Sequence, residues 1–600
     1  MTETTGTHRE LAERVFSLRF ESMPVWIDDR RIACLDDRTG VAHLHVAEIG
    51  QGQRRELTSG RERMQSLHGR GGVRHVVVGT DAGGNERQQL VVVDLATGDQ
   101  RQLTHDTERM HEPFLLSGDG RHVVYRTNDG DSGEFSLYSM DISNGVTSCL
   151  WFDAGQVRAH AMNDDGDLLV SVLTSNLDAD LYIVRADGTR QPLIQVADES
   201  WIIDAAFAGD DTALVLTNAG SDFVHLARVD LASGSFAPIV SESGDIEAMS
   251  VSPDGSKIAW SVNRDGYSVL HVATRGDEGN PIVADLPDGV VDRISWSPDS
   301  ESVAVGWTPT TGPARIWIAA ARDGSARPAF EPDPGDEDFA GVAPELIHFE
   351  TFDGRSIPAF WFESTDRDAP VIVDVHGGPE SQRRPGFLPV LQYLVASGFH
   401  VLTTNVRGST GYGKAYSHLD DVERRMDSVA DLPHAHAWVR SRLGGEPQIG
   451  IMGQSYGGFM TLAAITEYPE LWFAAVDVVG ISNFVTFLER TGAWRRRHRS
   501  AEYGSLEEHR DLLERISPIR KVGEIRAPLL VIHGRNDPRV PLHETEQLVA
   551  SLEGRDHPVE MLVFDDEGHG LSKRDNRIEG YARVAEFFHR VAAPSREPAR

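Results

Sequence analysis

The amino-acid sequence predicts two domains, a seven-bladed β-propeller followed by an α/β domain with a mainly parallel sheet. Three observations lead to this fold class. The 600 residues exceed the roughly 250–300 at which a single core stops growing. A strand-rich unit repeats through the first half with a period of about 45 residues. In the second half, strands alternate with longer helix-like segments.

Two patterns reveal the repeat. The pairs Leu57-Thr58 and Arg63-Met64 return as Leu103-Thr104 and Arg109-Met110. An acidic turn followed by a short apolar strand recurs at Asp119, Asp165, Asp210, Asp254 and Asp299. Each unit is closed by a second strand, as at 90–95, 137–142, 181–186 and 316–321. Four short strands per unit are typical of a propeller blade.

Counting the paired strands gives seven units, beginning near Val25, Val73, Pro113, Val157, Ile202, Ala248 and Ile294. We therefore predict a propeller over residues 23–328. Residues 1–22 contain a short amphipathic helix at 7–19, expected to pack on the second domain. A linker rich in Pro, Gly and acidic residues covers 329–341, and 342–600 form the second, α/β domain.

Composition excludes several classes of protein. The net charge of -34 disfavours nucleic-acid and anionic membrane partners. Residues 1–14 lack the features of a secretory signal and no run of about 18 apolar residues occurs, so we expect a soluble cytoplasmic protein. The two cysteines, Cys34 and Cys149, are expected to be small buried residues. The basic run 495–499 is expected to be a solvated face. The sequence leaves open whether the chain forms a homo-oligomer.

In the second half, strands predicted at 371–375, 401–404, 449–452 and 529–532 alternate with helix-like segments. Ser455 stands in Gly453-Gln454-Ser455-Tyr456-Gly457, between the third of these strands and a helical run at 459–468. Glycines on both sides allow the strained strand-to-helix turn that exposes a nucleophilic hydroxyl. Strand-turn-helix context favours this interpretation over a plain glycine turn.

A serine hydroxyl needs a base, and the base needs an acid that fixes its tautomer. We predict His569 as the base, because it follows the last predicted strand on a glycine-flanked loop with only a helix at 578–592 behind it. We predict Asp537, which follows the strand at 529–532, as the acid. Asp565 and Asp566 are rivals, but they lie too near the histidine in sequence to orient its ring.

Acyl transfer passes through an oxyanion that needs two preorganised donors. One is expected to be the backbone N–H of Tyr456, the residue after the nucleophile. The loop His376-Gly377-Gly378 follows the strand at 371–375 and is expected to supply the other at Gly378. No cluster with metal-ligand spacing and no phosphate loop is found, so no metal and no cofactor are expected.

With a propeller ahead of Ser455, Asp537 and His569, in that order, the chain resembles the prolyl oligopeptidase family, most of all its acylaminoacyl-peptidase branch. The resemblance covers almost the full length. Its most specific carriers are HGGP at 376–379, NVRGSTGYG at 405–413, GQSYGGF at 453–459, HGRNDPRVP at 533–541 and EGHG at 567–570. It implies a propeller over an α/β-hydrolase domain, so that only short peptides or small acylated molecules reach the site.

The resemblance also implies roles for single residues. Ser455 would be the nucleophile, His569 the general base and then acid, Asp537 the residue that orients it, and Tyr456 with Gly378 the oxyanion donors. Arg539 matches an arginine that holds a substrate carbonyl in acylaminoacyl peptidases, and a surface salt bridge is its alternative role.

The expected function is hydrolysis of short peptides, with release of an acylated or short N-terminal unit through an acyl-enzyme. Three alternatives stay open. One is an esterase or acyl-transferring hydrolase, since the same triad serves both. Another is a dipeptidyl aminopeptidase, although the Glu-Glu pair that grips a free amino terminus in that branch does not occur before the linker. The last is an inactive propeller scaffold.

Overall fold

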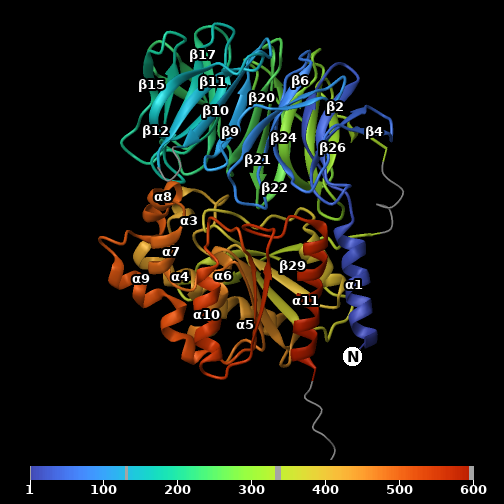
Figure 1. Ribbon diagram of the computed structural model, residues 1–600, viewed down its shortest axis with the longest axis vertical. Helices are drawn as coiled ribbons and strands as arrows, with labels where there is room; N and C mark the ends of the chain where they lie inside the picture. The colour runs from blue at the N-terminus through green and yellow to red at the C-terminus, as the bar shows by residue number, and fades with distance from the viewer. Residues whose placement is uncertain (1, 129–132, 332–338, 594–600) are drawn as a thin grey trace, which may run out of the picture.

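The computed structural model describes residues 2–128, 133–331 and 339–593. Two bodies are stacked along the long axis of the molecule (Figure 1). The first half of the chain, blue to green, forms the propeller, and the second half, yellow to red, forms the α/β domain below it. The predicted fold class is confirmed, with a seven-bladed propeller followed by an α/β-hydrolase domain.

Seven antiparallel units of four strands make up the propeller. The strands of the first three blades are β1 (Glu21–Trp26), β2 (Arg31–Asp36), β3 (His43–Glu48), β4 (Arg54–Glu56), β5 (Met64–His68), β6 (His75–Thr80), β7 (Gln89–Asp94), β8 (Gln100–Gln102), β9 (His111–Leu116), β10 (His122–Asn128), β11 (Phe135–Asp141) and β12 (Thr147–Met162). Those of the remaining blades are β13 (Leu168–Leu173), β14 (Ala179–Val184), β15 (Arg190–Ile194), β16 (Ile202–Phe207), β17 (Thr212–Thr217), β18 (His225–Asp230), β19 (Phe236–Val240), β20 (Ile246–Val251), β21 (Lys257–Arg264), β22 (Tyr267–Thr274), β23 (Ile282–Val283), β24 (Gly289–Trp296), β25 (Ser302–Pro309), β26 (Arg315–Ala320) and β27 (Ala326–Pro328).

Strand β12 belongs to two blades. It pairs with β11 as far as Gly155, which lies opposite Phe135, and with β13 from Gln156, which lies opposite Leu173. One long strand is therefore the outer strand of the third blade and the inner strand of the fourth. The expected start of the second blade at Val73 is wrong, because that blade begins with β5 and Val73 lies between β5 and β6.

The apolar cores of the propeller lie between neighbouring blades. Valines from the first and second blades share one core, for example Val46 and Val76. The last blade packs against the first in the same way, with Ile316 beside Trp26. The indole N–H of Trp26 also donates to the carbonyl of Ser295 at 3.1 Å, which helps to close the ring.

The α/β domain is built on one sheet with the order β28-β29-β31-β30-β32-β33-β34-β35. The first two strands are antiparallel to their neighbours and the others are parallel. Their bounds are β28 (Glu345–Glu350), β29 (Ser356–Phe362), β30 (Val371–Val375), β31 (His400–Thr404), β32 (Ile449–Gln454), β33 (Ala475–Val478), β34 (Leu529–Gly534) and β35 (Val559–Phe564). The remaining elements are the helices α1 (Thr2–Phe16), α2 (Pro389–Ala396), α3 (Lys414–Ser417), η1 (Val422–Arg424), α4 (Arg425–Ala430), α5 (Leu432–Leu443), α6 (Tyr456–Glu467), α7 (Phe484–Arg490), α8 (Ala493–Tyr503), α9 (Arg510–Ile516), η2 (Pro518–Glu524), α10 (His543–Glu553) and α11 (Arg574–Ala592).

Helices cover both faces of this sheet. On one face α1, α2 and α11 share an apolar core that includes Phe16, Tyr393 and Phe588. The N-terminal helix therefore lies along the α/β domain although it precedes the propeller in the chain (Figure 1). On the other face α5, α6 and α10 contribute Val439, Phe459 and Leu548 to a second core.

Two expectations about single features differ from the structure. Cys34 is buried, but Cys149 is exposed on β12, so the expectation of burial is wrong for it. In the basic run, Arg496 is exposed, whereas Arg495 and Arg499 are partly buried at the propeller side of the domain. Within the described ranges, each helix is too short or too polar to span a bilayer.

Candidate active site

Ser455 lies at the sharp turn between β32 and α6. Its backbone adopts φ 61 and ψ -118, a conformation that costs of order 1–3 kcal/mol for a residue with a side chain. The turn is held by the Ser455 N–H, which donates to the carbonyl of Val478 at 2.8 Å. The surrounding structure thus fixes the serine at the carboxyl edge of the sheet.

The glycines on either side of Ser455 are required by close packing. A Cβ at Gly457 would lie 2.0 Å from the carbonyl oxygen of Val375, and one at Gly453 would lie 2.2 Å from that of Gly457. No side chain fits at these distances. The five-residue pattern therefore reflects the space that the turn leaves beside β30.

His569 and Asp537 lie next to the serine. His569 Nε2 is 2.8 Å from Ser455 Oγ, and its Nδ1 is 2.6 Å from Asp537 Oδ2. The other carboxylate oxygen of Asp537 accepts the N–H groups of Arg539 and Val540 at 2.8 and 3.0 Å. The carboxylate is therefore fixed by its own loop, and it in turn orients the imidazole.

The neighbouring acids and histidines have other partners. Asp565 pairs with Arg535 and Asp566 with Lys573, away from the imidazole. His533 is buried and contacts Thr545 Oγ1 at 2.8 Å and the Val540 carbonyl at 2.9 Å.

His376 is likewise engaged elsewhere, since its Nε2 lies 2.8 Å from Ser409 Oγ. Burial lowers the pKa of His376 to about 4, so it is a neutral ring that holds its loop. Of the histidines considered from sequence, His569 is the one placed against Ser455.

The glycine loop after β30 lies against the nucleophile. A Cβ at Gly377 would lie 3.3 Å from Ser455 Cβ. Gly378 has φ 136, and its carbonyl accepts from Tyr503 OH at 3.1 Å and Arg499 Nη1 at 3.2 Å. Tyr456 is the first residue of α6, where the N–H has no partner within the helix. Both predicted donors therefore lie beside Ser455.

Arg539 forms an ion pair across the two domains. Its Nε donates to Oε1 of Glu86 in the propeller, and Arg495 donates to Oε2 of the same carboxylate. Burial alone would raise the pKa of the Glu86 carboxyl, but the two guanidinium groups hold it below its ordinary value. Arg539 is 42% exposed, so it keeps surface open to a ligand. Arg495 is not part of a solvated face, which corrects the expectation from sequence.

A cavity of about 210 Å³ opens at Ser455 between the two domains. Its lining residues are Asn176, Leu177, Trp201, Gly378, Glu380, Ser455, Arg499 and Arg539. The carboxylate of Glu380 accepts from Nδ2 of Asn176 at 2.9 and 3.1 Å. Sequence reasoning missed Asn176, Trp201 and Glu380. For Glu380 a signal existed, since it directly follows the HGGP motif.

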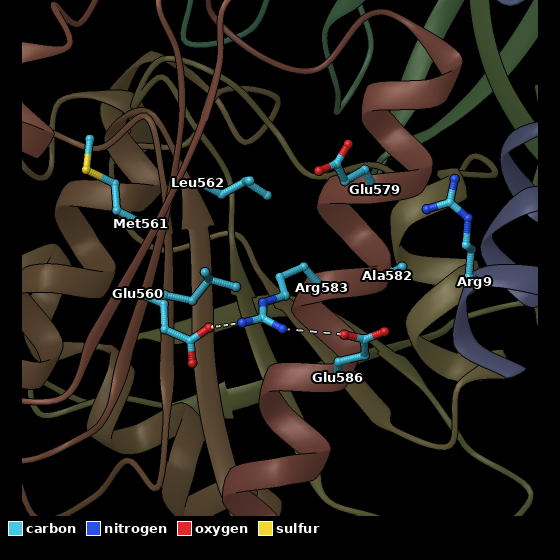
Figure 2. A pocket seen from close by; sticks show the side chains of 9 residues that line it. Arg9, Glu560, Met561, Leu562, Glu579, Ala582, Arg583 and Glu586 are labelled. Carbon is cyan, nitrogen blue, oxygen red and sulfur yellow. Dashed lines mark hydrogen bonds and ion pairs between the residues drawn. The ribbon is translucent and has the colours of Figure 1, made fainter. Parts of the chain in front are cut away.

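A larger cavity of about 650 Å³ lies between α1, β35 and α11 (Figure 2). Ion pairs of Arg583 with Glu560 and Glu586 cross it. None of the residues predicted from sequence to serve the site line this groove.

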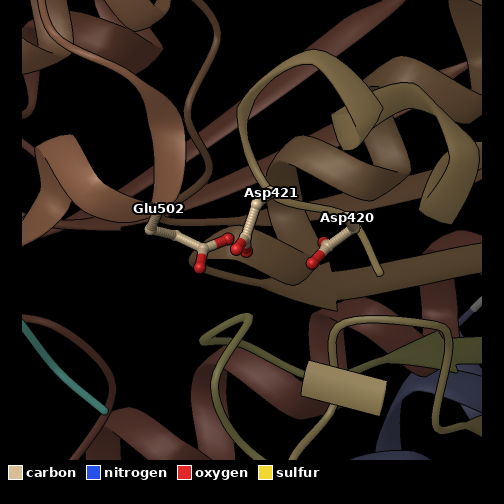
Figure 3. A group of neighbouring side chains, drawn as sticks. All are labelled: Asp420, Asp421 and Glu502. Atoms are coloured by element: carbon tan, nitrogen blue, oxygen red, sulfur yellow. The ribbon is translucent and has the colours of Figure 1, made fainter. Parts of the chain in front are cut away.

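Three carboxylates, those of Asp420, Asp421 and Glu502, approach within 4.8 Å of one another (Figure 3). The guanidinium of Arg425 pairs with both Asp420 and Glu502. The positive charge beside this acidic group is therefore supplied by the chain itself.

A serine at a strand-to-helix turn of an α/β-hydrolase domain, beneath a propeller, defines a two-domain serine hydrolase. Residues 385–595 match the family model described as "Prolyl oligopeptidase family". The α/β domain thus belongs to the prolyl oligopeptidase family of serine peptidases, as its motifs suggested.

Curated relatives of this chain include a dipeptidyl aminopeptidase and an acylamino-acid-releasing enzyme. Dipeptidyl aminopeptidase BIII of Pseudoxanthomonas mexicana is 26% identical over 538 residues, 85% of this chain and 77% of that protein. The acylamino-acid-releasing enzyme of Homo sapiens is 28% identical over 221 residues, 34% of this chain and 29% of that protein. The chain thus spans less than a third of the second relative.

The solved structure of a puromycin-hydrolysing peptidase of Mycobacterium tuberculosis superposes with a TM-score of 0.84. The two share 19% sequence identity, and the match covers 97% of this chain and 96% of that one. This likeness establishes the two-domain fold over nearly the full length.

Proposed function

We propose that this serine peptidase hydrolyses short peptides and releases an acylated or short N-terminal unit, with Ser455 as nucleophile. The observation that carries the proposal is the hydrogen-bonded series from Ser455 Oγ through His569 to Asp537, at 2.8 and 2.6 Å. Such an arrangement supplies both a base and an orienting acid.

The mechanism proceeds through an acyl-enzyme. His569 Nε2 takes the proton of Ser455 Oγ as that oxygen attacks the scissile carbonyl, while Asp537 stabilises the imidazolium. The N–H groups of Tyr456 and Gly378 stabilise the oxyanion, each by about 3 kcal/mol. His569 then gives its proton to the departing amine, and water attacks the ester by the same steps in reverse.

The cavity supports the preference for a short terminal unit. At about 210 Å³, it is smaller than the roughly 300–1,000 Å³ of ordinary ligand pockets. One or two residues fill such a volume. Arg539 lines it and would donate to a substrate carbonyl on the amino-terminal side of the scissile bond.

Dipeptidyl aminopeptidase activity is the second candidate, and one observation favours it. Glu380 places a carboxylate, braced by Asn176, on the wall of the same cavity. A free α-ammonium group would pair with this carboxylate, whereas an acetylated terminus would not. Similarity to a dipeptidyl aminopeptidase over 85% of the chain supports this alternative.

The test compares the purified protein with Ser455→Ala and with Ser233→Ala, a control on the exposed propeller surface. Substrates are N-acetyl-aminoacyl anilides, free dipeptidyl anilides and aryl esters. Ser455→Ala is expected to lower kcat at least about 10⁴-fold and to abolish labelling by a fluorophosphonate. If the protein hydrolyses only esters, it is an esterase. If the unaltered protein shows neither turnover nor labelling, it is an inactive scaffold.

A further inference from the structure

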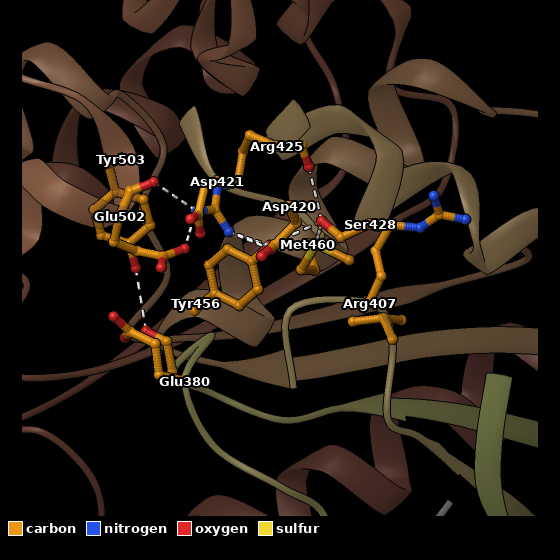
Figure 4. A network of polar contacts seen from close by, with 12 residues as sticks. Glu380, Arg407, Asp420, Asp421, Arg425, Ser428, Tyr456, Met460, Glu502 and Tyr503 are labelled. Atoms are coloured by element: carbon orange, nitrogen blue, oxygen red, sulfur yellow. Dashed lines mark hydrogen bonds and ion pairs between the residues drawn. The ribbon is translucent and has the colours of Figure 1, made fainter. Parts of the chain in front are cut away.

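Arg425, the first residue of α4, is buried in the α/β domain with a side chain 1% exposed. Its Nη1 donates to Asp420 and its Nη2 to the side chain of Glu502 and, at 2.8 Å, to the Glu502 carbonyl (Figure 4). One guanidinium group therefore pairs with two carboxylates. A buried ion pair is weak evidence for a role in stability, because desolvation offsets much of the attraction.

Tyr456 is the first branch of the Arg425 network. Its hydroxyl accepts from Arg425 Nη1 at 3.0 Å and donates to Asp420 Oδ2 at 2.9 Å. The guanidinium carbon lies 5.1 Å from the centre of the Tyr456 ring, within the range of a cation–π contact. The side chain of Tyr456 is thus held at its ring and at its hydroxyl, which fixes the start of α6.

Tyr503 is the second branch. Its ring centre also lies 5.1 Å from the Arg425 guanidinium carbon, and its hydroxyl donates to the Gly378 carbonyl at 3.1 Å. Gly378 has no side chain that could anchor its backbone. Its carbonyl belongs to the peptide bond with Pro379, next to the peptide that carries the donor N–H, so the groups that hold this carbonyl limit how Gly378 can rotate. Tyr503 is one of the two groups that do so.

We propose that Arg425 is a positioning residue that sets the two oxyanion donors relative to each other, through Tyr456 on one side and Tyr503 on the other. This role rests on the proposed function of Ser455. The two donor peptides come from loops 78 residues apart in sequence, Gly378 and Tyr456. Arg425 contacts the aromatic side chains that brace each of them.

The physical reason is that an oxyanion hole acts only when both N–H groups point at one oxygen position, about 2.7–3.1 Å from each. If the two N–H groups shift relative to each other by a few tenths of an ångström, binding of the tetrahedral intermediate is weakened more than binding of the planar ground-state carbonyl. Weakening the network should therefore lower kcat and leave KM nearly unchanged. Loss of general stability would lower the amount of folded enzyme without this selectivity.

The experiment uses the full-length enzyme with Tyr503→Phe and Arg425→Lys. Tyr503→Phe keeps the ring against Arg425 and removes only the hydroxyl that supports Gly378. The matched control is Arg407→Lys, because Arg407 is also buried and lies near this network (Figure 4), but directs its hydrogen bonds to Asp431 and Asp353. Each variant is assayed on the best anilide substrate. Inhibition is measured with a peptidyl boronic acid, which forms a tetrahedral adduct, and with the acyl product, which does not.

Both network variants are expected to lower kcat about 10- to 100-fold, with KM changed less than about twofold. The inhibition constant of the boronic acid should rise by the same factor as kcat/KM falls, and that of the product should stay constant. Arg407→Lys should leave all four values within about twofold. If Arg425→Lys does not fold, Tyr503→Phe still decides the question.

Equal loss of boronic acid and product affinity, or unchanged kcat in Tyr503→Phe, would overturn the positioning role. Failure of the proposed function has a different signature, because then the unaltered enzyme is not labelled at Ser455 and Ser455→Ala keeps its activity. The two failures are therefore distinguished by the unaltered enzyme and Ser455→Ala alone.

Discussion

Glu86 of the propeller forms an ion pair with Arg539 of the α/β domain, and Arg539 lies in the loop that also carries Asp537. The pair joins residues 453 positions apart in sequence. The ion pair places the Arg539 guanidinium at the wall of the cavity, and Glu86 in the opposite domain restrains the orientation of that guanidinium. Two predictions follow from this loop, one for Arg539 and one for Asp537.

Arg539→Ala is expected to raise KM for N-acetyl-aminoacyl anilides about tenfold, since a hydrogen bond from a charged group contributes about 1.5–3 kcal/mol. Simple aryl esters lack the second carbonyl, so their KM should change less than about twofold. Steady-state kinetics on both substrates checks this. The control is Arg535→Ala, an exposed arginine of the same loop that pairs with Asp565. Equal effects on peptides and esters would remove Arg539 from the substrate side of the site.

Asp537→Asn is expected to lower kcat about 10³- to 10⁴-fold while KM and the fold persist, because an amide does not select the productive tautomer of His569. Asp565→Asn and Asp566→Asn are the matched controls, and both should retain activity within about twofold. Activity that survives in Asp537→Asn and falls in Asp566→Asn would reassign the acid.

Glu380→Gln separates the two candidate activities. Loss of the carboxylate should lower kcat/KM for free dipeptidyl anilides about tenfold or more, because a charged partner of the ammonium group is lost. Cleavage of N-acetylated substrates should change less than about twofold. Glu553→Gln, on an exposed position of α10, is the control. Equal effects on both substrate classes would show that Glu380 shapes the cavity without reading the terminus.

His418 forms a pH-dependent contact between the domains. Its Nδ1 lies 2.6 Å from Asp421 and its Nε2 2.7 Å from Glu199 of the propeller. These hydrogen bonds raise the pKa of His418 from 6.5 to about 10. The folded pKa exceeds the ordinary one, so the contact contributes fully below about pH 6.5 and is lost as pH rises through about 10.

Glu199→Gln should therefore lower the thermal midpoint by about 1–3 °C at pH 7, and the difference from the unaltered protein should vanish above pH 10 or so. Thermal unfolding across this range provides the measurement, with Glu56→Gln on the exposed first blade as control. The same difference at every pH would exclude the ionised His418 contact as its cause.

Much of the fold follows from local patterns. The propeller could be predicted from acidic turns spaced about 45 residues apart, because each blade is built from hairpins between strands that are close in sequence. The strand before Ser455 and the order Ser455, Asp537, His569 were sufficient to nominate residues that the fold brings together. Such motifs work because each residue follows directly on a strand whose edge position the sheet dictates.

What the sequence did not predict depends on contacts between distant segments. Arg495 looks like part of a solvated run until Glu86 of another domain lies beside it. Trp201 and Asn176 line the cavity only because the propeller loops face Ser455. The second blade was placed too late, at Val73, because strand β5 (Met64–His68) is mostly polar and gives no apolar signal.

Helix α8 touches both domains. At its start, the Trp494 side chain packs against the core of the third and fourth blades, and its carbonyl accepts from Gln156 of the propeller at 2.7 Å. At its end, Tyr503 holds Gly378 beside the nucleophile. A rigid helix cannot keep both contacts if the domains swing apart to admit a peptide. Tyr503 and Gly378 lie in the same domain, so the contacts of Trp494 with the propeller are the ones that separation of the domains would break. Helix α8 thus links closure of the two domains to the loop beside the nucleophile.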